Sequence, residues 1–367
     1  MAANEQGHAM VENSGQSGHR PIVSVIMSVH NGEPYLREAI DSILAQSFTD
    51  FEFLIVNDCS SDNSQRIIIS YGDPRVRLVD NPTNIGLTKS LNKALALSRG
   101  HYVARMDADD RSHKERLAKQ VEFLNENPRV AVVGTQIQPI DAEGKTIRKG
   151  GSRKAVDPVA LAWHWIFDNP LAHSTTLFRR EIIWERMKGY DETFRTSQDF
   201  ELWSRVAHLY EICNLDEVLV DFRLHANSVS RRYTTEDVIK LTPVYRQNLG
   251  RILQTSEFPQ EFATRWLHIT MPALTKIGNP TEVLAMFKDV RCRFLAVYPE
   301  AYRNKQVRAH CAAVLMRCAR YYAPSDRLGS LKFMFATLRM GQLPIRELII
   351  CSLFLMPGAR SLMKRLR

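Results

Sequence analysis

The hydrophobic positions of the first 135 residues form short continuous runs, separated by stretches with helical spacing. The runs predict strands at Ile22–Val29, Phe51–Val56, Val76–Val79, His101–Met106 and Val130–Thr135. Between them, apolar residues three and four positions apart predict helices at Pro34–Gln46, Ser64–Ser70, Leu87–Leu97 and Ser112–Asn125. Ser112 and Glu115 have the spacing of a capping box at the start of the last helix. This alternation predicts β-α-β crossovers and a mostly parallel sheet flanked by helices.

The pattern changes character near Arg231. Before it, a helix is expected at Phe200–Ala207 and a short strand at Val218–Phe222. After it the spacing is helical, and the expected helices are Val238–Leu253, Phe262–Thr275, Glu282–Val297, Gln306–Tyr322, Leu328–Met340 and Pro344–Met356. We therefore expect an α/β fold followed by a C-terminal all-helical region at residues 233–367. Residues 1–20 are polar and are predicted to be a disordered N-terminal segment.

Charge divides the chain at the same place. Residues 1–230 hold 26 basic and 31 acidic residues, a net charge of −5, whereas residues 231–367 hold 23 basic and 9 acidic residues, a net charge of +14. A basic region of this size predicts an anionic partner, either a membrane surface or a nucleic acid. No nucleic-acid-binding motif is present and aromatic residues are not interleaved as stacking platforms, so no nucleic acid is expected. Basic and apolar residues near the C-terminus instead predict docking on an anionic membrane, with a packed core helix and a solvated tail as the alternative.

Composition and targeting signals narrow the class of protein. Hydrophobic residues make up 44% of the chain and charged residues 24%, as in an ordinary globular protein. The six cysteines include no C-x-x-C pair, which argues against a zinc ribbon and suits a reducing compartment. The N-terminal segment lacks the apolar core of a secretory signal, and the longest apolar run, Leu348–Met356, is about half of a membrane span. We expect a cytoplasmic protein, with its C-terminal region peripheral on the inner face of the membrane.

Polar side chains collect after the predicted strands. His30-Asn31-Gly32-Glu33 follow the first strand, Asn57–Asp62 follow the second, and Asp107-Ala108-Asp109-Asp110 follow the strand that ends at Met106. Ligands of parallel sheets bind beyond the carboxyl ends of the strands, so these residues are candidate site residues. No G-x-G-x-x-G follows the first strand and no G-x-x-x-x-G-K-[ST] occurs, which disfavours dinucleotide oxidoreductases and P-loop proteins.

Six sequence blocks, taken together, resemble the family 2 glycosyltransferases. They are Ile26–Gln46, Leu54–Ser64, Asn84–Gly100, Ala104–Asp110, Gly189–Trp203 and Arg223–Ser230. A D-x-D triplet alone is a weak signal, but six blocks in the family's order are a strong one. The resemblance covers residues 21–232 and implies a GT-A fold with a nucleotide-binding half at about 21–135 and an acceptor half at about 136–232. It implies an inverting, metal-dependent glycosyltransferase that moves a sugar from a UDP-, dTDP- or GDP-linked donor to a glycan or lipid-linked acceptor in cell-surface polysaccharide biosynthesis.

The D-x-D triplet, Asp107 to Asp109, is the candidate metal site. A nucleotide-sugar loses a diphosphate whose charge a divalent cation stabilises, and carboxylate oxygens suit Mg²⁺ or Mn²⁺. The alternative is a solvated acidic turn at the start of the next helix, where Asp110 would favour the helix dipole. By resemblance, His225 also reaches the metal or the diphosphate; it is equally open to a structural role.

The same resemblance assigns donor-binding residues. It implies that Asp58 binds the base or the ribose and that His30, Asn31 and Glu33 line the same side, although Asn-Gly is also a common turn signal. Asn84, Lys89 and Asn92 fall where the family approaches the pyrophosphate. Many members have an arginine immediately before the asparagine at 92, where this chain has Leu91, so Lys89 or Arg105 supplies the positive charge.

Asp199 is the candidate catalytic base. An acceptor hydroxyl is a weak nucleophile, and a carboxylate placed beside it contributes roughly 10²–10⁴-fold in rate. Many relatives have Glu-Asp here, whereas this chain has Gln198 before the aspartate. The alternative for Asp199 is a first-turn or capping acid of its helix. Gln198, Trp203 and His173 are predicted on the acceptor side.

Two other classes of function remain as alternatives. A sugar nucleotidyltransferase would also use a divalent cation, but it requires a glycine-rich basic loop after the first strand, and residues 30–36 (HNGEPYL) do not form one. A non-catalytic basic scaffold would bind membrane or nucleic acid through residues 233–367. The presence together of Asp58, Asp107, Asp109 and Asp199 favours an enzyme.

Overall fold

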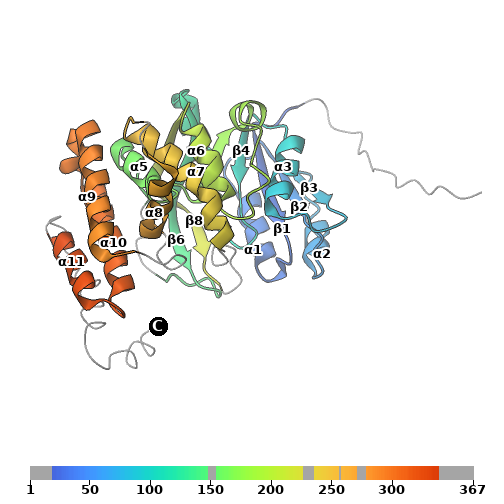
Figure 1. Ribbon diagram of the computed structural model, residues 1–367. Coiled ribbons are helices and arrows are strands. Elements are labelled where there is room, and N and C mark those ends of the chain that lie inside the picture. The colour runs from blue at the N-terminus through green and yellow to red at the C-terminus, as the bar shows by residue number, and fades with distance from the viewer. Residues whose placement is uncertain (1–18, 148–153, 226–234, 256–257, 271–277, 339–367) are drawn as a thin grey trace, which may run out of the picture.

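The computed structural model describes residues 19–147, 154–225, 235–255, 258–270 and 278–338. Eight strands form one sheet in the order β3-β2-β1-β4-β7-β6-β8-β5 (Figure 1). The strands are β1 (Val23–Val29), β2 (Phe51–Asn57), β3 (Val76–Asp80), β4 (Tyr102–Arg105), β5 (Arg111–Ser112), β6 (Val130–Ile140), β7 (Leu177–Arg179) and β8 (Glu211–Arg223). The predicted helix at Pro344–Met356 and all but the last two residues of the predicted N-terminal segment lie outside the described residues.

The first half of the sheet is the parallel array that the sequence predicts. β1 pairs in parallel with β2 and β4, and β2 pairs in parallel with β3. The connections contain α1 (Glu33–Leu44), α2 (Ser64–Ile69) and α3 (Leu87–Leu97). β1 and β2 are buried along almost their whole length, because helices cover both faces of a parallel sheet.

The core consists of two layers, one on each face of the sheet. Side chains of α1, α2 and α4 (Arg116–Glu126) pack on the face that carries Val25 and Met27. Side chains of α3, α5 (Pro158–Trp165) and α6 (Gln198–Val206) pack on the face that carries Ile26 and Leu54. Alternate residues of one strand therefore face opposite layers, as the two-residue period of a strand requires.

The second half of the sheet is mixed. β7 runs antiparallel to both β4 and β6, β6 runs parallel to β8 through several irregularities of register, and β5 runs antiparallel to β8. β8 begins at Glu211, seven residues before the predicted strand, and β6 continues to Ile140. Four of the seven strand pairs are parallel, so the expected mostly parallel sheet is confirmed.

The predicted capping box at Ser112 is wrong. Ser112 lies in β5, opposite Val220 of β8, and its backbone N–H donates to the Ser42 hydroxyl at 3.0 Å. Helix α4 begins only at Arg116, after Glu115, whose side chain makes no capping hydrogen bond. The local sequence pattern assigned Ser112 to the start of a helix, but pairing with the distant strand β8 places it in a strand instead.

Further helices extend the second layer away from the sheet. They are α7 (Thr235–Ile252), α8 (Gln260–Thr270), α9 (Pro280–Val297), α10 (Lys305–Tyr322) and α11 (Arg327–Leu338). Short helical turns occur at His173–Thr175, Glu181–Arg186 and Pro299–Tyr302. α9, α10 and α11 lie at the end of the molecule farthest from β1–β3 (Figure 1).

The C-terminal helices share their core with the α/β part. Trp163 of α5 is fully buried, and its ring lies 4.8 Å from the Phe294 ring and 6.2 Å from the Phe287 ring of α9, measured between centroids. Tyr245 of α7 donates a 2.8 Å hydrogen bond to the Phe167 carbonyl. The division predicted at residue 233 therefore separates segments that pack on one another. None of the described helices combines the length and the hydropathy needed to cross a membrane.

Candidate functional site

Three carboxylates cluster directly after β4. An oxygen atom from each of Asp107, Asp109 and Asp110 lies within 4.8 Å of the others. The side chains of Asp107 and Asp109 are 30% and 32% exposed, whereas Asp110 is buried. The acidic turn does not open the next helix, as the alternative had it, because β5 intervenes and α4 begins at Arg116.

Mutual repulsion and burial shape the electrostatics of this cluster. Burial and the charge of Asp107 raise the pKa of Asp109, and burial together with both neighbouring carboxylates raises the pKa of Asp110 well above its usual value. Arg105, which is 2% exposed, forms an ion pair with Asp107. The partly exposed carboxylates of Asp107 and Asp109 offer the oxygen ligands that suit a divalent cation.

The end of β8 brings His225 to the cluster. His225 Nε2 lies 2.8 Å from Asp109 Oδ2, and the imidazole ring lies 5.1 Å from the Tyr35 ring of α1. Arg223 Nε donates to the Asp109 carbonyl at 2.8 Å, and the Arg223 backbone N–H donates to Asp110 Oδ1 at 2.8 Å. The acidic loop is thus held from β8, and the histidine named by the resemblance is adjacent to the predicted metal ligands.

Asp58 is a buried acceptor at the end of β2. Asp58 is 2% exposed. Its Oδ1 accepts hydrogen bonds from Asn81 Nδ2 at 2.8 Å and from the Ile85 N–H at 2.9 Å. Its Oδ2 accepts one from the Gly86 N–H at 2.8 Å. Gly86 has a φ of +89°, a conformation that favours glycine. Asp58 therefore fixes the loop that carries exposed Asn84 into α3.

His30, Asn31 and Glu33 connect the loop after β1 to the loop after β2. His30 Nδ1 lies 2.9 Å from the Asp58 carbonyl oxygen, and Asn31 Oδ1 accepts a 2.8 Å bond from a backbone N–H of the second loop. Glu33 Oε1 accepts a 2.8 Å bond from Asn63 Nδ2. All three residues are exposed, and they show the turn chemistry that the sequence offered as the alternative. A contact with the nucleotide stays a prediction.

Asn92 and Lys89 lie in α3 and are placed differently. Lys89 is exposed in the first turn. The side chain of Asn92 is buried, donates from Nδ2 to the Tyr190 carbonyl at 2.9 Å and accepts at Oδ1 from the Tyr190 N–H at 2.9 Å. Asn92 Nδ2 also donates to Glu192 Oε1 at 3.0 Å, and a contact between Asn92 and a diphosphate stays a prediction.

Asp199 lies in the first turn of α6 and is held by a residue that the sequence did not single out. Asn169 Nδ2 donates to Asp199 Oδ2 at 2.7 Å, and Lys154 Nζ donates to the Asn169 carbonyl at 3.0 Å. The residue before the helix, Ser197, has a φ of +57°, in the strained left-handed region. Burial raises the pKa of Asp199. A carboxylate with a raised pKa and one fixed oxygen is suited to accept a proton.

Of the predicted acceptor-side residues, Gln198 and Trp203 lie in α6 and His173 lies in a short helical turn before β7. His173 Nε2 lies 2.8 Å from the Tyr190 hydroxyl, and burial with the charge of Arg105 lowers the pKa of His173 well below its usual value. Gln198 is buried at the start of α6. Trp203 is fully buried, with its ring centroid 6.2 Å from that of His173, and its place on the acceptor side stays a prediction.

Arg105 connects the two parts of the site. Its positive charge lowers the pKa of His173, as burial does. On Asp109 and Asp199 the same charge partly offsets burial, which raises the pKa of both carboxyl groups. The charge of one buried arginine therefore acts on both the acidic cluster and the base candidate. The predicted role of Arg105 against a pyrophosphate stays a prediction, since its visible partner is Asp107.

Sequence comparisons agree on one family. The profile of glycosyl transferase family 2 matches residues 24–187. EpsE of Bacillus subtilis, named as a glycosyltransferase, is 35% identical over 233 residues, which cover 62% of this chain and 81% of EpsE. The O-antigen biosynthesis glycosyltransferase WbnJ of Escherichia coli is 32% identical over 219 residues, which cover 57% of this chain and 82% of WbnJ. An uncharacterized glycosyltransferase of Haemophilus influenzae is 30% identical over 239 residues, which cover 62% of this chain and 73% of that protein.

A solved structure shares the fold. Residues 1–349 of S. aureus TarS, crystallised in complex with UDP-GlcNAc, superpose with a TM-score of 0.53 at 19% identity. The match covers 87% of this chain and 92% of that chain. At this identity the likeness establishes the arrangement of helices and strands.

Proposed function

This chain belongs to glycosyl transferase family 2 and is a glycosyltransferase with the GT-A fold, and we propose that it transfers a sugar from a nucleotide-sugar, with a divalent cation, to a glycan or lipid-linked acceptor. The observation that carries the proposal is the cluster of Asp107, Asp109 and Asp110 directly after β4, with His225 Nε2 2.8 Å from Asp109 Oδ2. The name of WbnJ, with which this chain shares 32% identity, supports a role in cell-surface polysaccharide biosynthesis.

The acidic cluster fits a divalent cation. Asp107 and Asp109 offer partly exposed carboxylates, and His225 lies beside Asp109. Their oxygen-rich donor set suits Mg²⁺ or Mn²⁺. A bound cation would supply Lewis-acid stabilisation of the diphosphate leaving group, an effect worth several kcal/mol.

Asp199 performs the proton transfer in this proposal. The acceptor hydroxyl donates its proton to the Asp199 oxygen that Asn169 does not hold, and the acceptor oxygen forms a bond to the anomeric carbon as the bond to the diphosphate breaks. Direct displacement inverts the configuration at that carbon. In this proposal neutral His173, whose Nε2 lies 2.8 Å from the Tyr190 hydroxyl, contacts the incoming acceptor.

A panel of donors tests the proposal. UDP-, dTDP- and GDP-sugars are titrated into the protein by calorimetry, with and without Mn²⁺. We expect one base to be bound preferentially and binding to tighten with Mn²⁺. Failure of all three classes to bind in the presence of Mn²⁺ contradicts the proposed function.

We expect Asp58→Ala to weaken donor binding by about tenfold or more, on the scale of one or two lost hydrogen bonds to a charged group. The carboxylate holds the Ile85 and Gly86 amides, and therefore the loop that carries Asn84. The dissociation constant of the preferred donor is the measurement. Asp41→Ala, on the solvent-facing side of α1, is the matched control, and equal affinity in both variants would remove Asp58 from the donor site.

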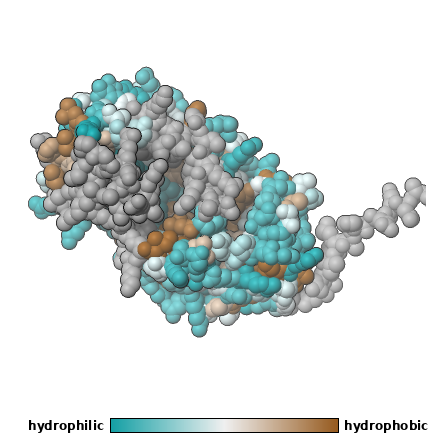
Figure 2. Space-filling model, turned by 90° about the horizontal axis from the view of Figure 1, so that it is seen from below, coloured by the Kyte–Doolittle hydropathy of each residue, from teal (hydrophilic) through white to brown (hydrophobic). Residues whose placement is uncertain are grey.

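The basic C-terminal region is proposed to bring the enzyme to an anionic membrane. Residues 231–367 have a net charge of +14, and α11 exposes Leu328 (68%) and Phe335 (62%). Figure 2 shows hydrophobic residues on the surface at the end of the molecule where α9–α11 lie. Exposed apolar side chains beside positive charge are the features that bind a lipid interface. The predicted apolar segment Leu348–Met356 lies outside the described residues.

We expect the protein to co-sediment with vesicles that contain phosphatidylglycerol, and less so at high salt, because screening weakens attraction to the surface. Vesicles of phosphatidylcholine alone are the control. Deleting residues from Leu343 onward should reduce sedimentation and spare donor binding. If the full chain binds neither vesicle at any salt concentration, or the truncated chain precipitates, these helices complete a protein core or a dimer contact instead.

A further inference from the structure

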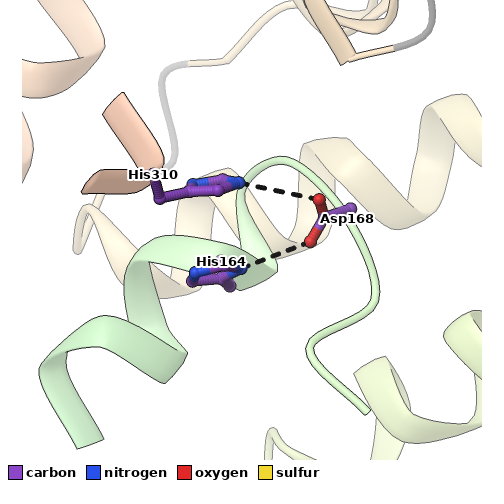
Figure 3. A group of neighbouring side chains, drawn as sticks. All are labelled: His164, Asp168 and His310. Carbon is purple, nitrogen blue, oxygen red and sulfur yellow. Dashed lines mark hydrogen bonds and ion pairs between the residues drawn. The ribbon is translucent and has the colours of Figure 1, made fainter. Parts of the chain in front are cut away.

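A second group of potential metal ligands is separate from the acidic cluster. His164 projects from α5, Asp168 lies in the loop that follows α5, and His310 projects from α10 (Figure 3). One ligand atom of each lies within 4.8 Å of the others. The residues belong to segments 142 to 146 positions apart in the chain, so the fold has brought them together, and the proposed sugar transfer uses none of them.

The distances within this group are longer than those of a typical hydrogen bond and close to those between ligands of one ion. His164 Nδ1 lies 3.4 Å from Asp168 Oδ1, and His310 Nε2 lies 3.6 Å from Asp168 Oδ2. A hydrogen bond of this type normally spans about 2.7–3.2 Å. Two ligand atoms bound at about 2.0–2.1 Å to a tetrahedral ion are separated by roughly 3.3 Å. Figure 3 shows both imidazoles turning a ring nitrogen toward the same carboxylate.

His310 is a buried polar side chain without a conventional partner. It is 9% exposed, and neither of its ring nitrogens has a hydrogen-bond partner in the part of the chain that the structure describes. The His164 ring stacks on it with centroids 3.8 Å apart, and the Phe167 ring meets it edge-on at 5.2 Å. An unsatisfied buried nitrogen costs free energy, and ligation of Nε2 would satisfy it.

We propose that His164 Nδ1, His310 Nε2 and the Asp168 carboxylate bind a divalent transition-metal ion of the zinc class, which fastens α10 to α5. Two imidazoles and one carboxylate form a donor set typical of Zn²⁺, with water completing the coordination. The side chain of Asp168 is 43% exposed, which leaves a route for the ion and the water.

Calorimetric titration with Zn²⁺ tests the site. The background is the full chain with Asp109→Asn, which disables the other candidate cation site. We expect one equivalent of Zn²⁺ to bind, affinity to fall at least tenfold in His164→Ala or His310→Ala, and His101→Ala, at an exposed histidine, to bind like its parent. Zn²⁺ should also raise the melting temperature of the parent and not of the His310 variant.

The histidine variants could fail to fold because they remove largely buried rings, so Asp168→Asn serves as a second test. Asparagine has the same shape as aspartate, and this side chain is partly exposed, so the variant should fold. We expect it to lose Zn²⁺ affinity and the visible absorption bands that bound Co²⁺ gives in the parent. No binding in the parent, or equal binding in the parent and in the His310 and Asp168 variants, overturns the proposal. These results do not depend on sugar transfer, since neither donor nor acceptor is present in the titration.

Discussion

Replacing Asp109 by asparagine should reduce sugar transfer by about 10²–10⁴-fold while the protein stays folded. Asp109 belongs to the acidic cluster and also contacts His225, whose Nε2 lies 2.8 Å from its Oδ2. Loss of its charge weakens the hold on a cation whose contribution to the transition state is several kcal/mol, and each 1.36 kcal/mol is tenfold in rate. The initial rate of transfer at saturating donor is the measurement.

Two controls make this result specific. Asp50→Asn makes the same chemical change in a loop that precedes β2 and should be as active as the wild type. Circular dichroism and the melting temperature show whether Asp109→Asn is folded, which we expect because its carboxylate already carries a cost of burial and repulsion. A folded Asp109→Asn protein with wild-type turnover would remove this carboxylate from the catalytic site.

Replacing Asp199 by asparagine should lower kcat by roughly 10²–10⁴-fold and leave the donor dissociation constant close to that of the wild type. The substitution keeps the size of the side chain and removes its ability to accept the acceptor's proton. Asn169→Ala should cause a smaller fall in kcat, because the carboxylate remains but loses the 2.7 Å hydrogen bond that orients it. Single-turnover rates and donor titrations separate the two effects. Loss of donor binding with an unchanged rate from bound donor would reverse the assigned roles.

The pH dependence of turnover gives a second reading of Asp199. Burial raises the pKa of Asp199, so its carboxylate takes up a proton at a higher pH than the value of about 3.9 of an exposed aspartate. The base must be ionised to act, and turnover at saturating metal and donor should therefore fall as the pH is lowered through that raised pKa. In Asp199→Asn the residual rate should lack this step.

The parallel half of the fold could be predicted from the sequence because its signals are local. β1 and β2 are continuous apolar runs, and α3 was predicted with its observed limits, Leu87–Leu97. The errors lie where distant segments pair. Ser112 has the pattern of a helix cap but pairs with β8, and the three-residue strand β7 owes its place to neighbours on both sides, β4 and β6.

The candidate site divides in the same way. Asp107, Asp109 and Asp199 could be named from sequence blocks, and the fold brings His225 beside Asp109. Asn169 and Lys154 could not be named, because nothing local to them indicates that they meet α6. The sequence also does not show whether a side chain faces a ligand or packs inside the protein. Trp203 and Asn92 lie in blocks that resemble the family, and both side chains are buried against other residues of the chain.

The most direct test of the proposed mechanism is the release of nucleoside diphosphate from the preferred donor, with acceptor present, before and after removal of divalent cations. The account predicts that EDTA abolishes release in the wild type, that excess Mn²⁺ restores it, and that Mn²⁺ does not restore it in Asp109→Asn. Undiminished release in EDTA would contradict the assignment of the acidic cluster as the cation site that activates the donor.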